Sequence, residues 1–241
     1  MATNLVNMES ASFQSLDDDF CYKNNVAQAN VYVRMGFLRK VYSILSVQLV
    51  ITTCTAFVLR FTPIVRKYVS ENHWLVAAAM IMSLVLIMAL YVKRKETPTN
   101  YLLLTAFTVV QAYSVGVIAT YYDDVIVIQA FLLTAAVSIT LTMYTLQSKR
   151  DFSKLGGSLF AGLCILIVGG LAQMFIGSTS FEMLLAGGGA LLFSLFIVYD
   201  THMIMQRLSP EEYILATIEL YLDIINLFLE LLRLLEAMRR N

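Results

Sequence analysis

The chain has 241 residues, of which 59% are hydrophobic and 14% are charged, and its mean hydropathy is +0.71. Soluble globular domains carry about 25% charged residues, so this composition excludes an ordinary soluble domain and favours a membrane protein. Because the formal net charge is zero, no bulk electrostatic attraction to nucleic acid is expected.

Seven hydrophobic runs follow one another along the chain, and each approaches the ~20 residues that a helix needs to span a bilayer. The runs cover residues 41–61, 74–92, 101–121, 125–147, 156–176, 181–203 and 213–235. Residues 1–35, which contain the acidic string 17–19, are interpreted as a polar cytosolic tail without a hydrophobic signal segment. The sequence therefore predicts an all-α membrane protein, a seven-helix transmembrane bundle that residues 36–241 form as a single domain.

Lysines and arginines indicate the orientation of this bundle. Those before the first run and in the second and fourth loops are Lys23, Arg34, Arg39, Lys40, Lys93, Arg94, Lys95, Lys149, Arg150 and Lys154. The third and fifth loops have none, so the positive-inside rule predicts a cytosolic N-terminus. Arg66 and Lys67 in the first loop run against this trend.

The charges near the C-terminus leave two arrangements open. Seven crossings would place Arg233, Arg239 and Arg240 in the lumen, whereas the charge rule prefers them in the cytosol. The second arrangement requires a re-entrant last segment, which is tolerated only where protein or a cavity surrounds it. We favour a seventh helix at the bundle centre and leave its exit side open.

The last run carries a line of polar residues in a segment that is otherwise apolar. The line consists of Glu219, Asp223, Asn226, Glu230 and Arg233. Their steps of four, three, four and three residues place them along one face of a helix. Since apolar residues occupy the other directions, the line has to face protein or water inside the membrane.

Asp223 is expected to meet Asp200, which lies near the end of the sixth run. Counting along the helices puts Asp200 ~10 Å and Asp223 ~15 Å from the same membrane face, so the two carboxyl groups could meet. Facing carboxyl groups share a proton, and the ionised pair could hold a cation. A solvated or capping role is an equal alternative for Asp200 alone, whereas the depth of Asp223 favours a function.

Other acids on the same path are secondary candidates. Glu219 is interpreted as an accessory on the ion path, and Glu230 could pair with Arg233 one turn away. Glu182 and Glu211 lie at the mouths of runs, where a wet helix end is the simpler interpretation. Acidic mouths would nonetheless concentrate cations at a pore entrance.

Glycines and cysteines are assigned structural roles. The glycines gather in the fifth and sixth runs, 187–189 among them, and small residues let membrane helices approach closely. They could also give the sixth helix a hinge. Cys21, Cys54 and Cys164 match neither a disulfide framework nor a zinc spacing, so we interpret them as small core residues.

Four strings in the sequence resemble a known family. They are Tyr199-Asp200-Thr201, Leu220-Tyr221-Leu222-Asp223-Ile224-Ile225-Asn226-Leu227-Phe228, Phe37-Leu38-Arg39-Lys40-Val41-Tyr42 and Thr145-Leu146-Gln147-Ser148-Lys149-Arg150-Asp151-Phe152. The first two are similar to the signatures of the transmembrane BAX inhibitor motif family, and the others resemble its Golgi anti-apoptotic (lifeguard) branch, found in eukaryotes and some poxviruses. The resemblance implies a seven-helix bundle with the last helix central. It also implies a pH-sensitive calcium leak channel that lowers store calcium, and inhibition of apoptosis.

The resemblance implies roles for individual residues. The family's paired aspartates fall on Asp200 and Asp223, which would sense pH and bind calcium weakly and transiently. Lys93, with Arg94 beside it, occupies the slot of a basic latch that holds the aspartate of span six in bacterial members. Protonating the pair at low pH would free the latch and open the bundle. At high pH the ionised pair would bind the latch or a cation and close it.

The expected partners are calcium ions and the lipid bilayer. A homo-oligomer, or other regulators of apoptosis and calcium stores, are further candidates, whereas nucleic acid is not expected. No cofactor is expected, because calcium would be the permeant ion. The resemblance implies a multi-pass protein of the Golgi or endoplasmic reticulum membrane.

Two other function classes stay open. Paired intramembrane aspartates also equip aspartyl intramembrane proteases, but the Gly-x-Gly-Asp string of that class is absent before Asp223. A non-conducting scaffold that protects cells by binding partners is the other alternative. A zinc hydrolase would lack ligands, since only His73 and His202 exist. We therefore expect no enzymatic activity.

Overall fold

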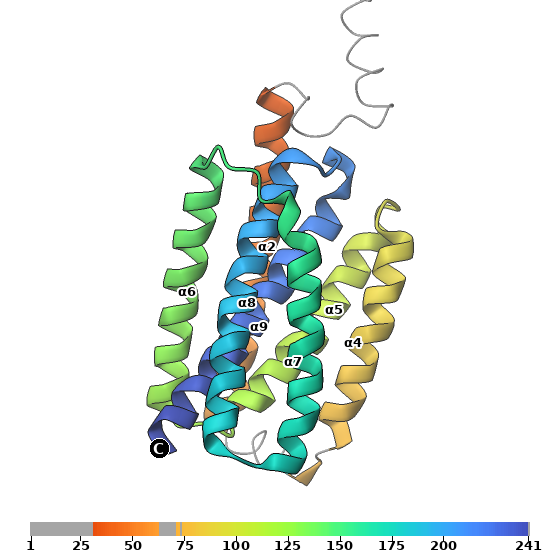
Figure 1. Cartoon of the computed structure of the whole chain (residues 1–241). Coiled ribbons are helices and arrows are strands. Elements are labelled where there is room, and N and C mark those ends of the chain that lie inside the picture. The colour runs from red at the N-terminus through yellow and green to blue at the C-terminus, as the bar shows by residue number, and fades with distance from the viewer. Residues whose placement is uncertain (1–30, 63–70, 73, 241) are drawn as a thin grey trace, which may run out of the picture.

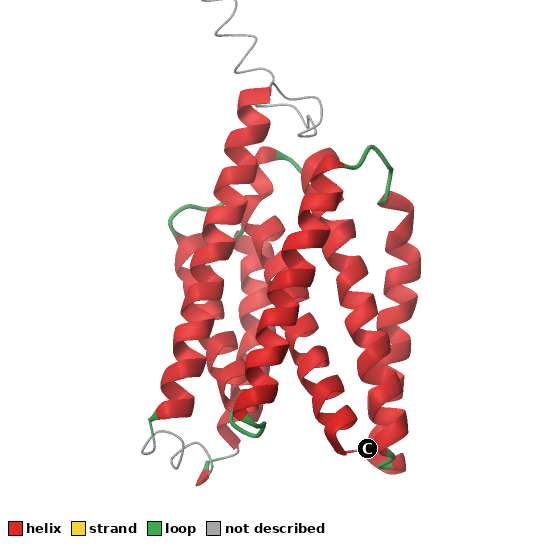
Figure 2. Cartoon of the chain, turned by 90° about the vertical axis from the view of Figure 1, so that its left-hand side faces the viewer, coloured by secondary structure: helices red, strands yellow, loops and turns green. Residues whose placement is uncertain are grey.

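The computed structural model describes residues 31–62, 71–72 and 74–240, and this part of the chain is helical throughout, without strands (Figures 1 and 2). Its seven long helices are α2 (Val31–Phe61), α4 (Trp74–Lys93), α5 (Thr99–Ala119), α6 (Asp124–Gln147), α7 (Gly156–Ile176), α8 (Thr179–Gln206) and α9 (Tyr213–Arg240). Two short 3-10 helices, η1 (Ser153–Leu155) and η2 (Pro210–Glu212), precede α7 and α9. Predictions that concern residues 1–30, Arg66, Lys67 and His73 lie outside the described residues.

Six of the described helices, α2 and α4 to α8, are long and apolar enough to cross a membrane. Each of the first six predicted runs coincides with one of them, although α2 begins about three turns earlier, at Val31, and the third run overruns α5 by two residues. The seventh run falls in α9, which has 28 residues but is set apart from the other six by its charges. These helices fit a multi-pass membrane protein.

The distribution of apolar and polar side chains indicates that lipid surrounds the bundle. Apolar side chains point outward, as with Phe175 of α7, which is 90% exposed. Polar side chains point inward, as with Gln48 of α2, which is 3% exposed. A soluble protein hides such apolar surface, whereas lipid tails accommodate it. The same pattern corrects the interpretation of Cys54 and Cys164, which are exposed rather than part of the core. Their small thiols are weakly polar and are compatible with an apolar surface.

The long helix α9 packs against α8, α6, α2 and α5, whereas α7 packs mainly on α8, and α4 mainly on α5. It is continuous, and its 28 residues span ~42 Å at the α-helical rise. It begins at the bundle end that holds the connection from α8 and finishes at the opposite end (Figures 1 and 2). The re-entrant alternative for the last segment therefore does not describe this structure.

Ion pairs hold the end of α9 beside the neighbouring helices. Arg239 Nη1 lies 2.8 Å from Asp123 Oδ2 at the start of α6, and Arg240 Nη1 lies 3.7 Å from Glu182 Oε2 in α8. Arg60 pairs with Asp124 at the same end and donates to the backbone oxygen of Ala119 at 2.6 Å. The arginines at this end thus have acidic partners from neighbouring helices, although the positive-inside rule counts lysines and arginines alone.

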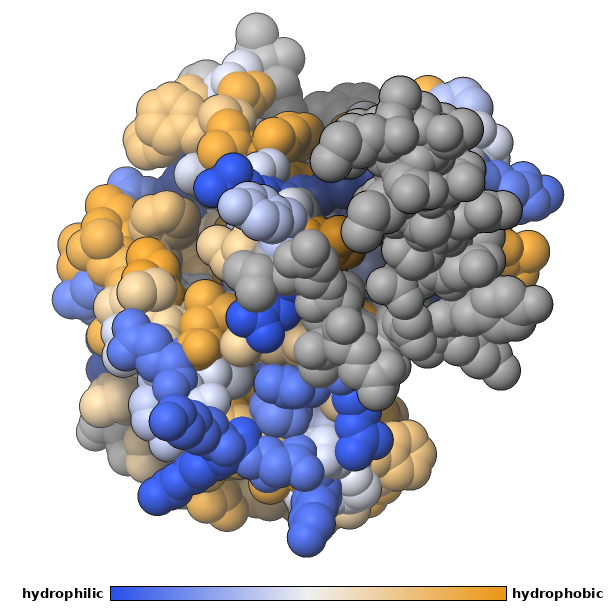
Figure 3. Space-filling view, turned by 90° about the horizontal axis from the view of Figure 1, so that it is seen from above, coloured by the Kyte–Doolittle hydropathy of each residue, from blue (hydrophilic) through white to orange (hydrophobic). Residues whose placement is uncertain are grey.

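The opposite end of the bundle carries the basic loops of residues 93–95 and 149–154. Figure 3 looks onto this end and shows hydrophilic residues gathered beside the apolar flanks. The assignment of this end to the cytosol stays a prediction.

Candidate functional site

The structure brings Asp200 of α8 and Asp223 of α9 together inside the bundle. Their side chains are buried, with 8% and 6% of each residue exposed. The two carboxyl groups lie within hydrogen-bonding reach of each other. Two carboxyl groups can share a hydrogen bond only if one of them carries the proton. The arrangement is one in which the two carboxyl groups can share a proton.

One oxygen of the Asp223 carboxyl group is buried without a donor in the described part of the chain. Its Oδ2 is buried and has no hydrogen-bond partner among the described residues. A buried oxygen without a partner is costly, and such groups in native structures are explained by an unseen water, an ion or a function. A proton shared with Asp200, a water molecule or a cation could each satisfy this oxygen.

The reversal between α8 and α9 sets the register that joins the two aspartates. Ser209 Oγ accepts from the backbone N–H of Glu211, and the Glu212 carboxylate accepts from the backbone N–H of Ser209 at 3.4 Å. This reciprocal capping box, with Pro210 in the first helical position, starts a new helix immediately after α8 ends. The short connection forces α8 and α9 to run antiparallel and adjacent.

Glu219 lies one turn before Asp223 on α9 and is partly buried. Its carboxyl group is close enough to interact electrostatically with Asp200, with Glu212 and with Arg94. The predicted accessory acid thus lies between the aspartate pair and the charged loops at the end of the bundle.

The predicted latch residues contact acids other than Asp200. Lys93 Nζ lies 2.8 Å from both carboxylate oxygens of Glu96, on its own loop. Arg94 Nη2 lies 3.5 Å from Glu212 Oε1. Within the described chain neither residue forms an ion pair with Asp200. The basic cluster therefore ties the α4–α5 loop to η2, above the aspartate pair.

The two predicted pore-mouth acids lie at opposite ends of the bundle. Glu211 in η2 accepts from Lys95 Nζ at 3.2 Å, whereas Glu182 in the first turn of α8 pairs with Arg240. Each is a partly or fully exposed helix-end carboxylate held by a basic residue. This geometry is compatible both with wet helix ends and with two pore mouths.

A contact between His202 and Asp151 lies next to the pair and was not predicted. His202 Nε2 is 3.1 Å from Asp151 Oδ1, and Phe152 packs edge-on against the imidazole with 5.7 Å between ring centroids. The Ser153 hydroxyl and backbone N–H, with His202, lower the pKa of the exposed Asp151 carboxyl to about 2. The loop after α6 thereby covers the α8 segment that carries Asp200. The string from Thr145 to Phe152 drew attention to this loop in the sequence, but it did not predict the contact with His202.

A polar network on the other side of α9 was also missed. Gln48 Nε2 donates to Thr108 Oγ1 at 2.8 Å, and Thr52 Oγ1 shares a 2.8 Å hydrogen bond with the Tyr221 hydroxyl. Amides and hydroxyls within apolar runs seek partners on neighbouring helices, so Gln48 in the first run was a signal that sequence could have supplied.

The described residues do not include a group of three or more His, Cys, Asp or Glu side chains placed to hold a metal ion. Calcium takes about six to eight oxygen ligands, more than two carboxyl groups provide. The site suits a cation in passage better than a resident ion.

Comparison with known proteins agrees with the strings at this site. Residues 34–241 match the family described as "Inhibitor of apoptosis-promoting Bax1". The chain is 51% identical to Protein lifeguard 4 of Mus musculus over 227 residues, covering 94% of this chain and 95% of that protein. It is 49% identical to the Golgi anti-apoptotic protein of Vaccinia virus (strain Lister) over 227 residues, covering 94% and 96%.

A more distant relative extends the likeness to fungi. The chain is 38% identical over 234 residues to Bax inhibitor 1 of Schizosaccharomyces pombe, covering 97% of this chain and 88% of that protein. The family match covers α2 from Arg34 onward, the other six long helices and both aspartates. The chain therefore belongs to the BAX inhibitor (lifeguard) family of anti-apoptotic membrane proteins.

Proposed function

We propose that this protein is a pH-sensitive calcium leak of intracellular membranes, gated by the Asp200–Asp223 pair. The observation that carries the proposal is the meeting of two buried carboxyl groups from α8 and α9 inside the bundle. Intramembrane acids are costly to keep and commonly mark ion or proton pathways. No N–H or O–H among the described residues donates to Asp223 Oδ2, so the ionised pair could accept a cation there.

The proposed path follows the polar line of α9, with α9 as the central helix of a seven-helix transmembrane bundle. Packing of α9 on four helices supports this position. The basic loops would lie in the cytosol, so the aspartate pair would be nearer the cytosolic face, in a Golgi or endoplasmic reticulum membrane.

The proposed gate uses charge pairing at that face. Arg94 pairs with Glu212 and interacts with Glu219, which makes it a better latch candidate than Lys93, whose partner is on its own loop. At low pH, protonated acids release the latch and the bundle opens. At high pH, the ionised carboxylates hold the latch or a cation and the bundle closes.

The effect on apoptosis is proposed from the relatives. One of them is named Golgi anti-apoptotic protein, and this chain covers 96% of it. We propose that lowering store calcium through the leak is how the present protein protects cells. A non-conducting scaffold would protect cells without any flux.

Calcium flux in proteoliposomes loaded with a calcium dye tests the function. Asp223→Asn is expected to change the flux or its pH dependence, because the amide cannot ionise. Asp124→Asn, at the exposed end of α6, is the matched control. Unchanged flux and pH profile in Asp223→Asn would overturn the gate. Cleavage of a peptide substrate that is lost in the same variant would instead indicate a protease.

A further inference from the structure

A second polar pair lies on the same face of α9, farther from the cytosolic end. Glu230 is seven residues beyond Asp223, ~10 Å along the helix. Arg233 Nη1 donates to both carboxylate oxygens of Glu230, at 3.3 and 3.1 Å. The two side chains are 17% and 33% exposed, so the pair is largely withdrawn from the surface.

Gly189 of α8 provides the space in which the Glu230 carboxyl group lies. A Cβ atom at position 189 would be 2.7 Å from Glu230 Cδ and 2.8 Å from Cγ, distances that real Cβ atoms do not tolerate. The neighbouring Gly188 faces open space instead. A larger side chain at position 189 would therefore displace the Glu230 carboxyl group, which occupies that space.

Buried apolar side chains flank the polar line between this pair and the two aspartates. Ile197 of α8 and Leu227 of α9 are 0% and 1% exposed and pack in one cluster with Ala190. Between Asp223 and Glu230 the polar face is therefore narrowed to the half-buried Asn226. An apolar constriction between polar sites is a way of closing an ion path by excluding water.

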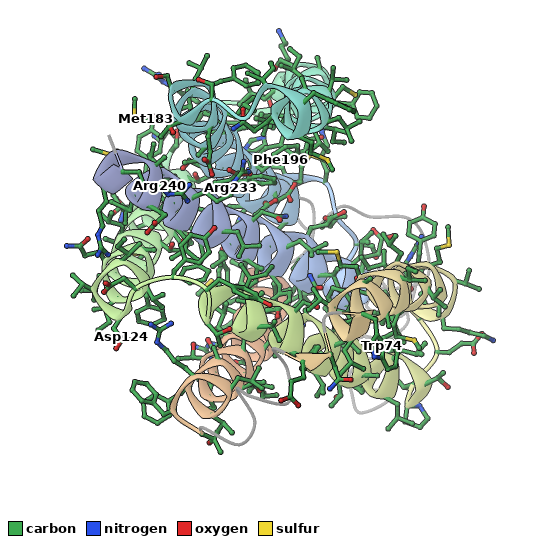
Figure 4. The ribbon with its side chains drawn as sticks, turned by 90° about the horizontal axis from the view of Figure 1, so that it is seen from below. Trp74, Asp124, Met183, Phe196, Arg233 and Arg240 are labelled. Atoms are coloured by element: carbon green, nitrogen blue, oxygen red, sulfur yellow. The ribbon has the colours of Figure 1, made fainter. Side chains whose placement is uncertain are left out.

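Charged side chains from several elements surround the second pair. The Tyr122 hydroxyl, at the α5–α6 turn, is close enough to interact with Arg233, Glu182, Glu236 and Arg240. Arg240 in turn pairs with Glu182 of α8 and with Glu236, at 3.7 and 3.1 Å. Figure 4 shows Arg233 and Arg240 along α9, on the side where it meets α8. Each carboxylate that could attract a cation here is held by an arginine.

We propose that Glu230 and Arg233, seated against Gly189, form a second gate on the path that begins at the Asp200–Asp223 pair. Arg233 closes it in two ways, because it neutralises Glu230 and places a fixed positive charge where a divalent cation would pass. Arginines at constrictions exclude cations by this electrostatic barrier. This inference rests on the proposed calcium leak and identifies how its non-cytosolic half is controlled.

Calcium flux in proteoliposomes tests the gate with both aspartates intact. Arg233→Gln is expected to raise the flux several-fold, because it frees the Glu230 carboxylate and removes the positive charge. Glu230→Gln is expected to lower the flux several-fold, because Arg233 is left unpaired. Arg239→Gln is the matched control, since Arg239 pairs with Asp123 at the exposed end and should leave the flux within twofold.

The outcomes separate the gate from the leak itself. Wild-type flux with no change in Arg233→Gln and Glu230→Gln would overturn the second gate alone. A wild-type protein that carries no calcium would overturn the proposed function, and the gate with it. A rise in Arg239→Gln equal to that in Arg233→Gln would also overturn the gate, because general loosening of the bundle end would then explain both.

The packing of the Glu230 carboxyl group against Gly189 can be tested without measuring conduction. Gly189→Ala is expected to lower the melting temperature of the detergent-solubilised protein, because its Cβ displaces the Glu230 carboxyl group. In a Glu230→Ala background, Gly189→Ala should change the melting temperature little, since the space beside position 189 is then free. Gly188→Ala, which meets open space, is the control. Equal losses from Gly189→Ala in both backgrounds would overturn this packing.

Discussion

Thr52 of α2 and Tyr221 of α9 share a 2.8 Å hydrogen bond between two buried hydroxyl groups. The Thr52 hydroxyl also donates to the backbone oxygen of Gln48 at 2.9 Å, so only Tyr221 depends on the bond between the two side chains. The Phe107 ring packs edge-on against Tyr221 with 6.0 Å between centroids and keeps water away from it. The bond joins the first long helix to the last.

This asymmetry predicts unequal costs for the two conservative substitutions. Thr52→Val leaves a buried phenol without a partner and should cost about 1–3 kcal/mol of unfolding free energy. Tyr221→Phe removes one hydrogen bond but leaves Thr52 bonded to Gln48, so about 0.5–1.5 kcal/mol is expected. Denaturant unfolding in detergent micelles measures both.

Thr53→Val is the control for this comparison. The Thr53 hydroxyl bonds only to the Leu49 backbone oxygen of its own helix, and its side chain is exposed. Its loss should be the smallest of the three. A cost for Tyr221→Phe larger than that for Thr52→Val would contradict the hydrogen-bond arrangement.

Acid sensitivity of the α6–α7 loop follows from Asp151. The Ser153 hydroxyl and N–H, together with His202, lower the pKa of Asp151 to about 2. A lowered pKa in the folded state means that the carboxylate stabilises the fold above its ordinary pKa of about 3.9. That stabilisation is lost as the pH falls from about 4 towards 2. Asp151→Asn should therefore show a smaller fall in melting temperature over this window than the wild type.

Two serine variants sharpen this measurement. Ser153→Ala removes the hydrogen bond from the Ser153 hydroxyl to Asp151 and should also flatten the pH profile. Ser158→Ala should not, because that hydroxyl donates to the Leu155 backbone oxygen. Parallel profiles for the wild type and Asp151→Asn would show that another group governs acid sensitivity.

The course of α9 predicts the accessibility of two new cysteines. With the native cysteines replaced, Lys149→Cys in the α6–α7 loop and Met238→Cys near the end of α9 lie at opposite ends of the bundle, and both native side chains are exposed. A membrane-impermeant thiol reagent added to sealed vesicles should label one and reach the other only after permeabilisation. Labelling of both from one side would mean that α9 does not cross.

The sequence by itself determined the membrane class, the helices and the pair of aspartates. Hydrophobic runs of spanning length leave little choice, because in lipid the backbone has to satisfy its own hydrogen bonds within each helix. The line from Glu219 to Arg233 was visible because its period is that of a helix. The depths of Asp200 and Asp223 could be counted from the ends of their runs, since the connection between them is short.

Only the tertiary structure decided which groups pair across helices. Side-chain contacts between distant segments depend on rotation and register, which a hydrophobic run does not encode. Arg94 therefore pairs with Glu212 rather than with Asp200, and Asp151 with His202. The glycine at position 189 looked like general packing, and its specific reason, the carboxyl group of Glu230, emerged only when α8 and α9 lay side by side. Likewise, the acidic partners of Arg239 and Arg240, from the start of α6 and from α8, became visible only in the fold.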